Sequence, residues 1–565
     1  MQLTPTRHAF WIKVPPLGTI SLLLAYLGFV LALEFISNNV PGAQHHQALG
    51  IRAAWLAVAQ VPLLILLAGK NSIIGFITGT SYERLNVLHR WTSRVLLLLA
   101  TLHLGYQNYG WNLYGLRQME WNTDDCPPTG IAAYAILLWM NLTTVAPLRN
   151  LSYEFFVVQH ILTFFGFLIA VMMHLPSTAL YSRVYIYIPI VLYFLDRAIR
   201  TSRFAYNNAT PGLATLTAME GGVTKIRISM KHIKTWSPGT HVLLKIPKLG
   251  LIESHPATIA SIPSSHTNDL VFILKSHKGF TNRLLTSASS STTSLLPKTS
   301  QDTTTPSQTL TALIDGPYGG SQADFAAFDS VLLIAGSTGV TFTLSLLLNI
   351  AHRASLQRRL PVRRLKFVWV VKNSSWTSWI SDELVSAFEQ LRNAGIEVEI
   401  DVFVTCDDAY TESALDSSKQ NAGCQCAVSQ GPCCCTRPSA PRTIDITALQ
   451  NPSDNSTNSA TPNEKSTATI TTTSPQGLST PPCCPKSSSP ALSSYVTFTP
   501  SRPNFPTLLT DFLAPAQGET AIAVCGPLEM NATVRTAAAR ISDERAVHKG
   551  TGAQGIYVHV EGFCW

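Results

Sequence analysis

Four histidines with one repeated spacing lie in the N-terminal third of the chain. His89 and His103 are in the apolar segment LNVLHRWTSRVLLLLATLHLGY, and His160 and His174 are in EFFVVQHILTFFGFLIAVMMHLP. Each pair is fourteen residues apart, which is about four turns of α-helix, so both histidines of a segment face the same way, ~21 Å apart. Two such helices side by side would present two imidazole pairs at two levels. That geometry can hold two stacked haems, each ligated from both faces.

Two simpler explanations compete with haem binding. A histidine in an apolar helix is often only a core residue, but ionisable side chains within a membrane are costly and usually functional. A single metal ion would need ligands about one turn apart, and the observed spacing is too long for that. Because one spacing occurs twice, we predict two haems b with His89, His103, His160 and His174 as ligands. We expect solvated positions without a role for His8, His45 and His46.

The helices that carry these histidines belong to a strongly apolar N-terminal part. The chain has 565 residues, enough for three or more domains, and only 13% of them are charged. The net charge of +8 comes without long basic runs, so nucleic acid is not an expected partner. The first apolar segment is longer than a usual signal sequence, so we predict a retained anchor. Six segments are long enough to span a bilayer: 17–36, 50–69, 87–106, 131–149, 155–175 and 183–200.

Loop charges predict how these segments are oriented. Basic residues gather around the second loop and after the last helix, at Lys70, Arg84, Arg90, Arg94, Arg197, Arg200 and Arg203. The third loop instead carries Glu120, Asp124 and Asp125. Positive loops stay in the cytosol, so the N-terminus and everything after residue 200 should be cytosolic. The third and fifth helices then run parallel, which pairs His89 with His160 near the cytosol and His103 with His174 near the outer face.

Beyond residue 203 the pattern changes to short strands separated by Gly and Pro turns. The stretches KIRISM, HVLLKIP, HPATIAS (255–261), KSHKGFTNRL (275–284) and IDGPYGG (314–320) predict a small antiparallel β-barrel. Residues 286–310 are rich in Ser and Thr, and we predict a flexible loop there.

From residue 326 strands and helices alternate, which predicts a parallel sheet with crossover helices. The turn AGSTGV (335–340) follows the first strand and would let the backbone approach a pyrophosphate, although many strand–helix turns look similar. Residues 407–500 are rich in Ser, Thr and Pro and contain seven cysteines. We predict a disordered insertion, with metal binding or redox sensing as the alternative. The sheet is expected to resume at TAIAVCGP (520–527) and to end with GIYVHVEGFCW.

Together these motifs resemble those of fungal ferric-chelate reductases, in the ferric reductase–NADPH oxidase superfamily. The similarity covers nearly all of the chain except two polar inserts, and AGKNSIIGFITGTSYERLNVLHRW (68–91) is similar to the family signature before the first haem histidine. The resemblance implies a six-helix transmembrane bundle with bis-histidine haems in residues 1–203. It implies an antiparallel β-barrel FAD-binding domain in 204–325, and an α/β NADP-binding domain of the ferredoxin–NADP reductase type in 326–565.

The resemblance also implies roles for single residues. HPATIAS is similar to a His-Pro-x-Thr flavin motif and KGFT to a segment that meets the flavin pyrophosphate, which assigns FAD to His255, Pro256, Thr258, Lys278, Gly279 and Thr281. GPYGG, AGSTGVT and CGP are similar to nucleotide motifs, which assigns Gly316, Pro317, Gly319, Gly336, Gly339, Thr341, Gly526 and Pro527. Cys525 is expected as a catalytic residue near the nicotinamide, with an ordinary buried strand residue as the alternative. Phe563 or Trp565 is expected to cover the flavin.

Two positions depart from the family pattern. Ala257 stands where an aromatic or larger residue is usual beside the flavin, and Ser337 stands where a second glycine is common in the nucleotide turn. The first departure could loosen flavin packing.

The function implied by the resemblance is electron transfer from cytosolic NADPH through FAD and two haems b to Fe(III), or Cu(II), across the membrane in support of iron uptake. Expected acceptors are ferric chelates or siderophores, with an iron permease or multicopper oxidase downstream. The plasma membrane is the expected location, with the vacuolar membrane as the alternative. A superoxide-generating NADPH oxidase would use the same path, but the equal histidine spacing favours the metalloreductase. A metal permease would need carboxylates inside the helices, where only Glu34 and the boundary residue Glu154 are available.

Overall fold

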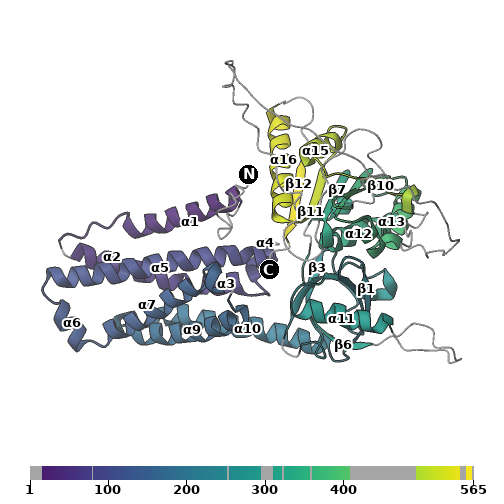
Figure 1. Ribbon diagram of the computed structural model, residues 1–565. Helices are drawn as coiled ribbons and strands as arrows, with labels where there is room; N and C mark the ends of the chain where they lie inside the picture. The colour runs from purple at the N-terminus through teal and green to yellow at the C-terminus, as the bar shows by residue number, and fades with distance from the viewer. Residues whose placement is uncertain are drawn as a thin grey trace, which may run out of the picture.

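The computed structural model describes residues 16–42, 44–78, 80–149, 151–250, 253–293, 309–320, 323–356, 359–407, 492–547 and 555–562. An elongated helical part carries two β-containing domains at one of its ends (Figure 1). Phe563, Trp565 and most of the predicted insertion, residues 408–491, lie outside the described residues.

Long helices lie at each predicted span: α1 (Leu17–Phe35), α2 (Gln44–Ala59) continued by α3 (Val61–Ala68), α5 (Tyr82–Leu113), α7 (Cys126–Thr143), α9 (Tyr153–His174) and α10 (Val184–Asn207). Pro62 lacks the amide hydrogen that would continue α2, which explains why the helix breaks before α3. Short helices connect the long ones: α4 (Ile73–Thr78), α6 (Arg117–Thr123), α8 (Ala146–Arg149) and the 3₁₀-helix η1 (Ser177–Arg183).

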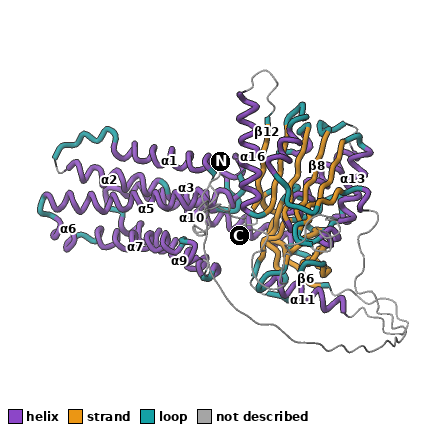
Figure 2. The backbone as a smooth tube through the Cα atoms, turned by 45° about the horizontal axis from the view of Figure 1, so that its top comes forward, coloured by secondary structure: helices purple, strands orange, loops and turns teal. Residues whose placement is uncertain are grey.

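The helical part has the surface of a membrane protein. Among the described residues, four segments are long and apolar enough to cross a bilayer, at residues 17–35, 44–68, 155–174 and 177–207, and α5 and α7 are not among them. The long helices lie side by side in both views (Figures 1 and 2). Large apolar side chains on them are exposed, among them Leu24, Phe29, Phe155 and Leu162. So much exposed apolar surface is unfavourable in water and is expected where lipid covers it.

The first β domain is a curved six-stranded sheet with the order β4-β3-β6-β1-β2-β5, and all its pairings are antiparallel. Its strands are β1 (Gly212–Met219), β2 (Val223–Ser229), β3 (Thr240–Lys245), β4 (His255–Thr258), β5 (Leu270–Lys275) and β6 (Leu310–Gly319). The predicted flexible loop is wrong for its first part, because residues up to 293 belong to helix α11 (Phe280–Thr293). Phe280, Leu284 and Ala288 recur every four residues and are buried, and this apolar face outweighs the Ser and Thr content.

The second β domain is a six-stranded parallel sheet with the order β10-β9-β8-β7-β11-β12. Its strands are β7 (Ser330–Gly336), β8 (Arg364–Val371), β9 (Glu397–Val404), β10 (Thr497–Thr499), β11 (Thr520–Gly526) and β12 (Ile556–Gly562). The predicted end of the insertion at residue 500 is therefore a few residues late, since β10 already pairs with β9.

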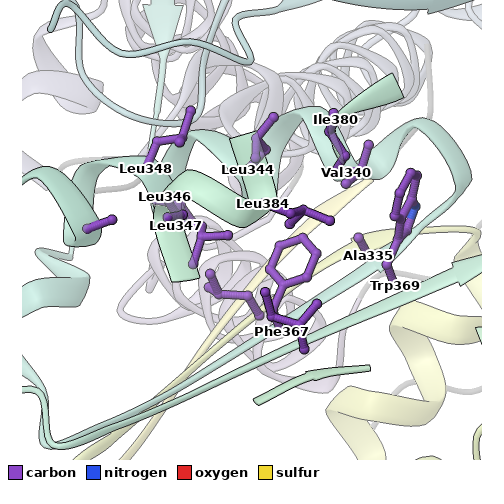
Figure 3. Packing of buried hydrophobic residues seen from close by; sticks show 14 of the residues in the cluster. Ala335, Val340, Leu344, Leu346, Leu347, Leu348, Phe367, Trp369, Ile380 and Leu384 are labelled. Carbon is purple, nitrogen blue, oxygen red and sulfur yellow. The ribbon is translucent and has the colours of Figure 1, made fainter. Parts of the chain in front are cut away.

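Helices cover both faces of the parallel sheet, so its strands are buried on both sides. The helices are α12 (Val340–Leu356), α13 (Ser381–Asn393), α15 (Phe505–Leu513) and α16 (Leu528–Val547). Along β7, Val331 and Leu333 pack with α12 and α13, whereas Leu332 and Ile334 pack with α15 and α16. Figure 3 shows the first of these cores, where Ala335 and Trp369 lie beside the start of α12. The predicted strand–helix alternation is thus a doubly wound fold.

Candidate functional site

The four histidines form two pairs between α5 and α9. The ring centroids of His89 and His160 are 6.4 Å apart, and those of His103 and His174 are 5.8 Å apart. We call His89 and His160 the near pair, since they lie toward the β domains, and His103 and His174 the far pair. With metal–nitrogen bonds of about 2 Å, two imidazoles on opposite sides of one ion have centroids roughly 6 Å apart. Both separations fit that arrangement, and the pairs are the ones expected for parallel helices.

Backbone carbonyls orient three of the four rings. A carbonyl oxygen can only accept a hydrogen bond, so each Nδ1 within reach of one carries the proton and leaves the Nε2 lone pair for a metal. The Nδ1 atoms lie at hydrogen-bond distance from the carbonyl oxygens of Leu64 (His89, 2.9 Å), Gly50 (His103, 2.8 Å) and Cys126 (His174, 2.7 Å). For His160, Nδ1 is enclosed and has no hydrogen-bond partner among the described residues, while its ring packs against Phe156.

A glycine lets α7 approach the far pair. An added Cβ at Gly130 would lie 2.5 Å from Cε1 of His174, closer than real atoms approach. The space around the far imidazole therefore depends on this glycine. The ring separations make the donor set suitable for haem iron at both levels, and at the far pair the fixed tautomers and the space at Gly130 fit it as well.

The two flavin motifs lie beside each other in the antiparallel domain. The His255 ring stacks on Phe280 at 4.2 Å with an interplanar angle of 10°, which brings β4 against the start of α11. Gly279 has a φ of +80°, and Thr281 accepts a hydrogen bond from the His277 amide at 2.8 Å, so this turn opens directly into the helix. A helix N-terminus beside β4 suits a pyrophosphate.

Strand alternation decides which β4 side chains can meet a flavin. Ala257 is 2% exposed and lies in the core of the antiparallel domain, whereas Pro256 and Thr258 take the opposite face. The expectation that Ala257 packs beside the flavin is therefore wrong, because its side chain faces inward. His241 on β3 is the pairing partner of Thr258 and shares its face.

Two of the three predicted nucleotide motifs, AGSTGVT and CGP, meet at the carboxyl edge of the parallel sheet, whereas GPYGG lies in the antiparallel domain. A Cβ at Gly336 would lie 2.9 Å from Cδ of Pro527, and one at Gly526 would lie 3.3 Å from the Gly336 amide nitrogen. Ligands of doubly wound sheets bind at this edge. Ser337 has a φ of +52°, in the left-handed region that glycine adopts most easily, so the turn keeps its shape despite the substitution. Gly339 ends this turn in η4 (Ser337–Gly339).

The remaining predicted residues have mixed surroundings. Thr341 is buried in the first turn of α12 and donates to the Thr338 carbonyl at 3.0 Å. Cys525 is 5% exposed, and burial, aided by the Glu561 charge, strongly raises the pKa of its thiol. The thiol is therefore neutral at physiological pH, and its role at the nicotinamide stays a prediction.

The GPYGG turn, with Gly316, Pro317 and Gly319, lies where β6 meets α10, and the Gly316 carbonyl accepts from Asn207 at 2.7 Å.

Three consecutive residues that the sequence reasoning missed join the helical part to both β domains. At the start of α5, the Tyr82 hydroxyl and the Glu83 carboxylate each lie 3.1 Å from Nε2 of His241 on β3. The next residue, Arg84, donates to the Val560 carbonyl of β12 at 2.9 Å. From the sequence, Arg84 is expected only to set the orientation of the loops. Since α5 also carries His89, this first turn connects the helix of the near pair to β3 of the antiparallel domain and to β12 of the parallel-sheet domain.

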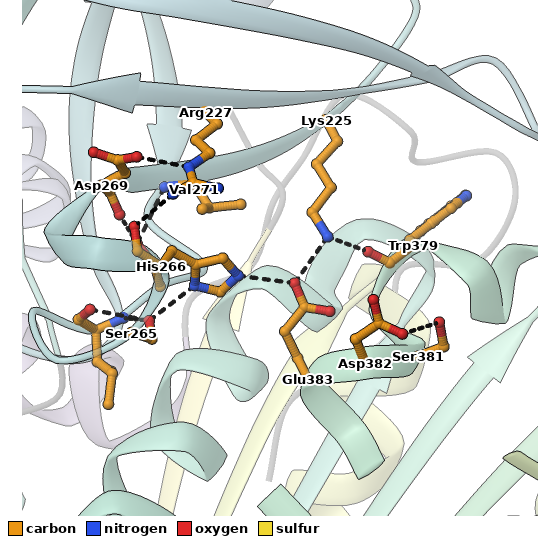
Figure 4. A network of polar contacts seen from close by, with 12 residues as sticks. Lys225, Arg227, Ser265, His266, Asp269, Val271, Trp379, Ser381, Asp382 and Glu383 are labelled. Atoms are coloured by element: carbon orange, nitrogen blue, oxygen red, sulfur yellow. Dashed lines mark hydrogen bonds and ion pairs between the residues drawn. The ribbon is translucent and has the colours of Figure 1, made fainter. Parts of the chain in front are cut away.

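A polar network joins the two β domains to each other (Figure 4). Glu383 on α13 accepts from Lys225 on β2 at 2.8 Å and lies 3.0 Å from Nε2 of His266. Burial alone would raise the pKa of Glu383, but the His266 hydrogen bond and the Lys225 charge outweigh it and lower that pKa to about 2. His266 and the two residues after it, Thr267 and Asn268, all have positive φ. Such a backbone is unfavourable for non-glycine residues, which indicates that the contact holds it in place.

Apolar helices with paired histidines, an antiparallel β domain and a doubly wound α/β domain define the class as a membrane protein with two appended β-containing domains. Three protein-family models match the chain: "Ferric reductase like transmembrane component" at residues 53–171, "FAD-binding domain" at 210–322 and "Ferric reductase NAD binding domain" at 328–539. The chain belongs to the ferric reductase family, with FAD-binding and NAD-binding domains.

Curated relatives of the chain are also described as ferric or ferric/cupric reductases. "Probable cell surface ferric reductase kap2" of Aspergillus oryzae is 30% identical over 394 residues, 66% of this chain and 50% of that protein. "Ferric/cupric reductase transmembrane component 7" of Saccharomyces cerevisiae is 26% identical over 388 residues, 66% of this chain and 58% of that protein. The chain thus spans about half the length of the curated relatives it matches. A flavohemoglobin from Malassezia yamatoensis aligns over 91% of this chain and 98% of its own at 12% identity, but its TM-score of 0.36 is too low to support a shared fold.

Proposed function

We propose that the protein is a transmembrane ferric-chelate reductase. It would move electrons from cytosolic NADPH through FAD and two haems b to Fe(III), or to Cu(II), on the far side of the membrane, in support of iron uptake. The proposal depends on one observation: α5 and α9 hold two pairs of imidazole rings, with centroids 6.4 Å apart in the near pair and 5.8 Å apart in the far pair. The family membership supplies the flavin and nucleotide context.

Each set of residues has a defined task in this proposal. When bound, the flavin would convert a two-electron donor into single electrons and the haems would carry them singly. The near pair would hold one haem and the far pair the other, while the carbonyls of Leu64, Gly50 and Cys126 keep the protons on Nδ1. The β4 and α11 motifs would hold FAD, and the turn after β7 would hold the NADPH pyrophosphate. Burial keeps the proton on the Cys525 thiol, so it would contribute a neutral surface beside the nicotinamide.

The orientation in the membrane is part of the same proposal. The basic loops lie on the side of the near pair and the β domains, which supports a cytosolic position for them. The plasma membrane is the proposed location, with the vacuolar membrane as the alternative. Ferric chelates or siderophores would be the acceptors, and an iron permease or multicopper oxidase would act downstream.

Difference spectra of membranes would test the haem assignment. We expect dithionite-reduced minus oxidised spectra to show b-type bands, and the His103→Ala/His174→Ala double variant to lose roughly half of that signal, since one of two haems loses both ligands. The matched control is His232→Ala, because this histidine lies in the antiparallel domain, beside Tyr206. A spectrum unchanged in the double variant would refute the haem assignment.

The acceptor needs a separate assay. NADPH-dependent formation of the Fe(II)–ferrozine complex should be insensitive to superoxide dismutase if electrons pass directly to the metal. Inhibition by the dismutase would instead identify superoxide as the carrier and favour an NADPH oxidase.

A further inference from the structure

Polar rings gather at the ends of α2 and α5 that are remote from the β domains. The His46 ring is stacked with Tyr106 at 6.1 Å and 20°, and meets Tyr109 edge-on at 4.7 Å. The His45 ring lies 5.5 Å from that of His46. The prediction that these two histidines are simply solvated is wrong, because both are half-buried. His8, grouped with them in the sequence, lies outside the described residues.

This ring cluster lies directly beyond the far pair. Gly50 of α2 supplies the carbonyl at Nδ1 of His103, and His46 precedes Gly50 by one helical turn, ~6 Å along the axis. On α5, Tyr106 and Tyr109 follow His103 by three and six residues, which is ~4.5 and ~9 Å farther from the β domains. An electron that leaves the far pair in this direction therefore meets the cluster first along both helices.

The chemistry of His46 indicates a ligand. Its Nδ1 atom is enclosed and has no hydrogen-bond partner among the described residues. An enclosed polar nitrogen without a partner is unusual in a folded protein and is commonly explained by a bound ion or water. The ring centroids of His45 and His46 are 5.5 Å apart, which is close enough for both imidazoles to reach one ion.

Charge near the cluster favours a cation. Trp121 of α6 donates a hydrogen bond to Asn108 of α5 at 2.9 Å. Because Asn108 follows Tyr106 by two residues, α6 lies close to the ring cluster. Between residues 107 and 128 the chain carries one basic residue and three acidic ones, which are Arg117, Glu120, Asp124 and Asp125. A surface of this sign concentrates positive ions and disfavours anionic chelates.

We propose that His45 and His46 form a docking site for cationic metal with exchangeable ligands, Cu(II) above all, and that this site is separate from the place where ferric chelates would be reduced. Imidazole is a preferred ligand of copper. Among the described residues no group of three or more His, Cys, Asp or Glu side chains could hold a metal ion. A site with only a few protein ligands leaves coordination positions of the metal open. Such a site suits a substrate that must leave after reduction better than it suits a permanently bound ion. One electron, supplied by NADPH along the path of the proposed function, reduces Cu(II) to Cu(I), and no proton moves and no covalent bond forms.

The inference rests on the proposed reductase function, and its test separates the two. The detergent-solubilised, cofactor-loaded full chain is compared with the His45→Ala/His46→Ala double variant and with His232→Ala as the matched control. Titration of the oxidised proteins with Cu(II) is followed by electron paramagnetic resonance, which reports nitrogen ligands directly. We expect nitrogen hyperfine structure in the wild type and in the control, and its loss in the double variant.

Steady-state kinetics with NADPH give the second measurement. The double variant should raise KM for Cu(II) about tenfold while kcat changes little, which is the signature of lost substrate binding. KM for ferric citrate should stay unchanged, and so should the rate of haem reduction by NADPH without added metal.

Each outcome bears on one of the two proposals. Wild-type protein that shows no haem reduction by NADPH would refute the reductase function and leave the copper-binding result standing by itself. If haem reduction is normal but the double variant keeps its copper signal and its KM for Cu(II), the docking site is refuted. An equal rise of KM for Cu(II) and for ferric citrate would refute the selectivity for cationic metal.

Discussion

Replacement of Glu383 by glutamine should destabilise the contact between the two β domains. The Glu383 side chain is only 9% exposed, and its pKa is lowered from 4.5 to about 2 by His266 and Lys225 against the effect of burial. At about 1.4 kcal/mol per pKa unit, the ionised carboxylate contributes roughly 3 kcal/mol to stability at pH 7. For domains of this size, such a loss corresponds to a fall of about 5–10 °C in Tm.

The same contribution has a defined pH dependence. Because the pKa is lowered in the folded protein, the stabilisation is complete above pH 4.5 and is lost as the pH falls toward about 2. The difference in Tm between wild type and Glu383→Gln should therefore be constant from pH 7 to pH 5. The difference should shrink to about half or less near pH 3, because Glu383 is then protonated in the unfolded chain and folding no longer gains the full stabilisation of its ionised form.

Tryptophan fluorescence during heating of the solubilised protein measures this directly. Trp376 and Trp379 stack at 4.9 Å, and the Trp379 carbonyl accepts from Lys225 at 2.9 Å, so these two of the chain's 11 tryptophans report on the interface. Glu389→Gln is the matched control on the same helix, since Glu389 is exposed and bonded only at the surface to Tyr495. Equal Tm values at pH 7, or a difference that persists unchanged at pH 3, would refute the reasoning.

Three further substitutions test the site. Gly130→Val should abolish the far haem band and spare the near one, because the new side chain overlaps His174; a normal reduced spectrum would contradict this. His241→Ala should slow haem reduction by NADPH, because the contact between His241 and Glu83 is lost, and stopped-flow traces should show unchanged flavin reduction. Equal rates of haem reduction in the wild type and the variant would exclude a positioning role for His241. Ser337→Gly should raise stability by about 1 kcal/mol, since glycine takes the left-handed backbone without strain; an unchanged or lower Tm would contradict it.

The larger architecture could be predicted because it follows from local periodicity. Apolar runs long enough to span a bilayer, short alternating strands and strand–helix alternation each reflect how one element buries its own side chains. The error at residues 286–293 has the same origin, because the apolar face that begins at Phe280 was hidden by a Ser- and Thr-rich composition. Ala257 was misplaced because a motif gives residue types, whereas strand alternation gives the face.

By itself, the sequence determined that the two histidines of each helix lie on one face, four turns apart, because this depends only on helical pitch. Only the tertiary structure decided which carbonyls hold the Nδ1 protons of three of the four histidines, that Arg84 reaches Val560, and that His46 lies among tyrosines. The first of these contacts spans 25 residues and the second spans 476. No local pattern encodes such contacts, because they exist only after separately folded elements have packed together.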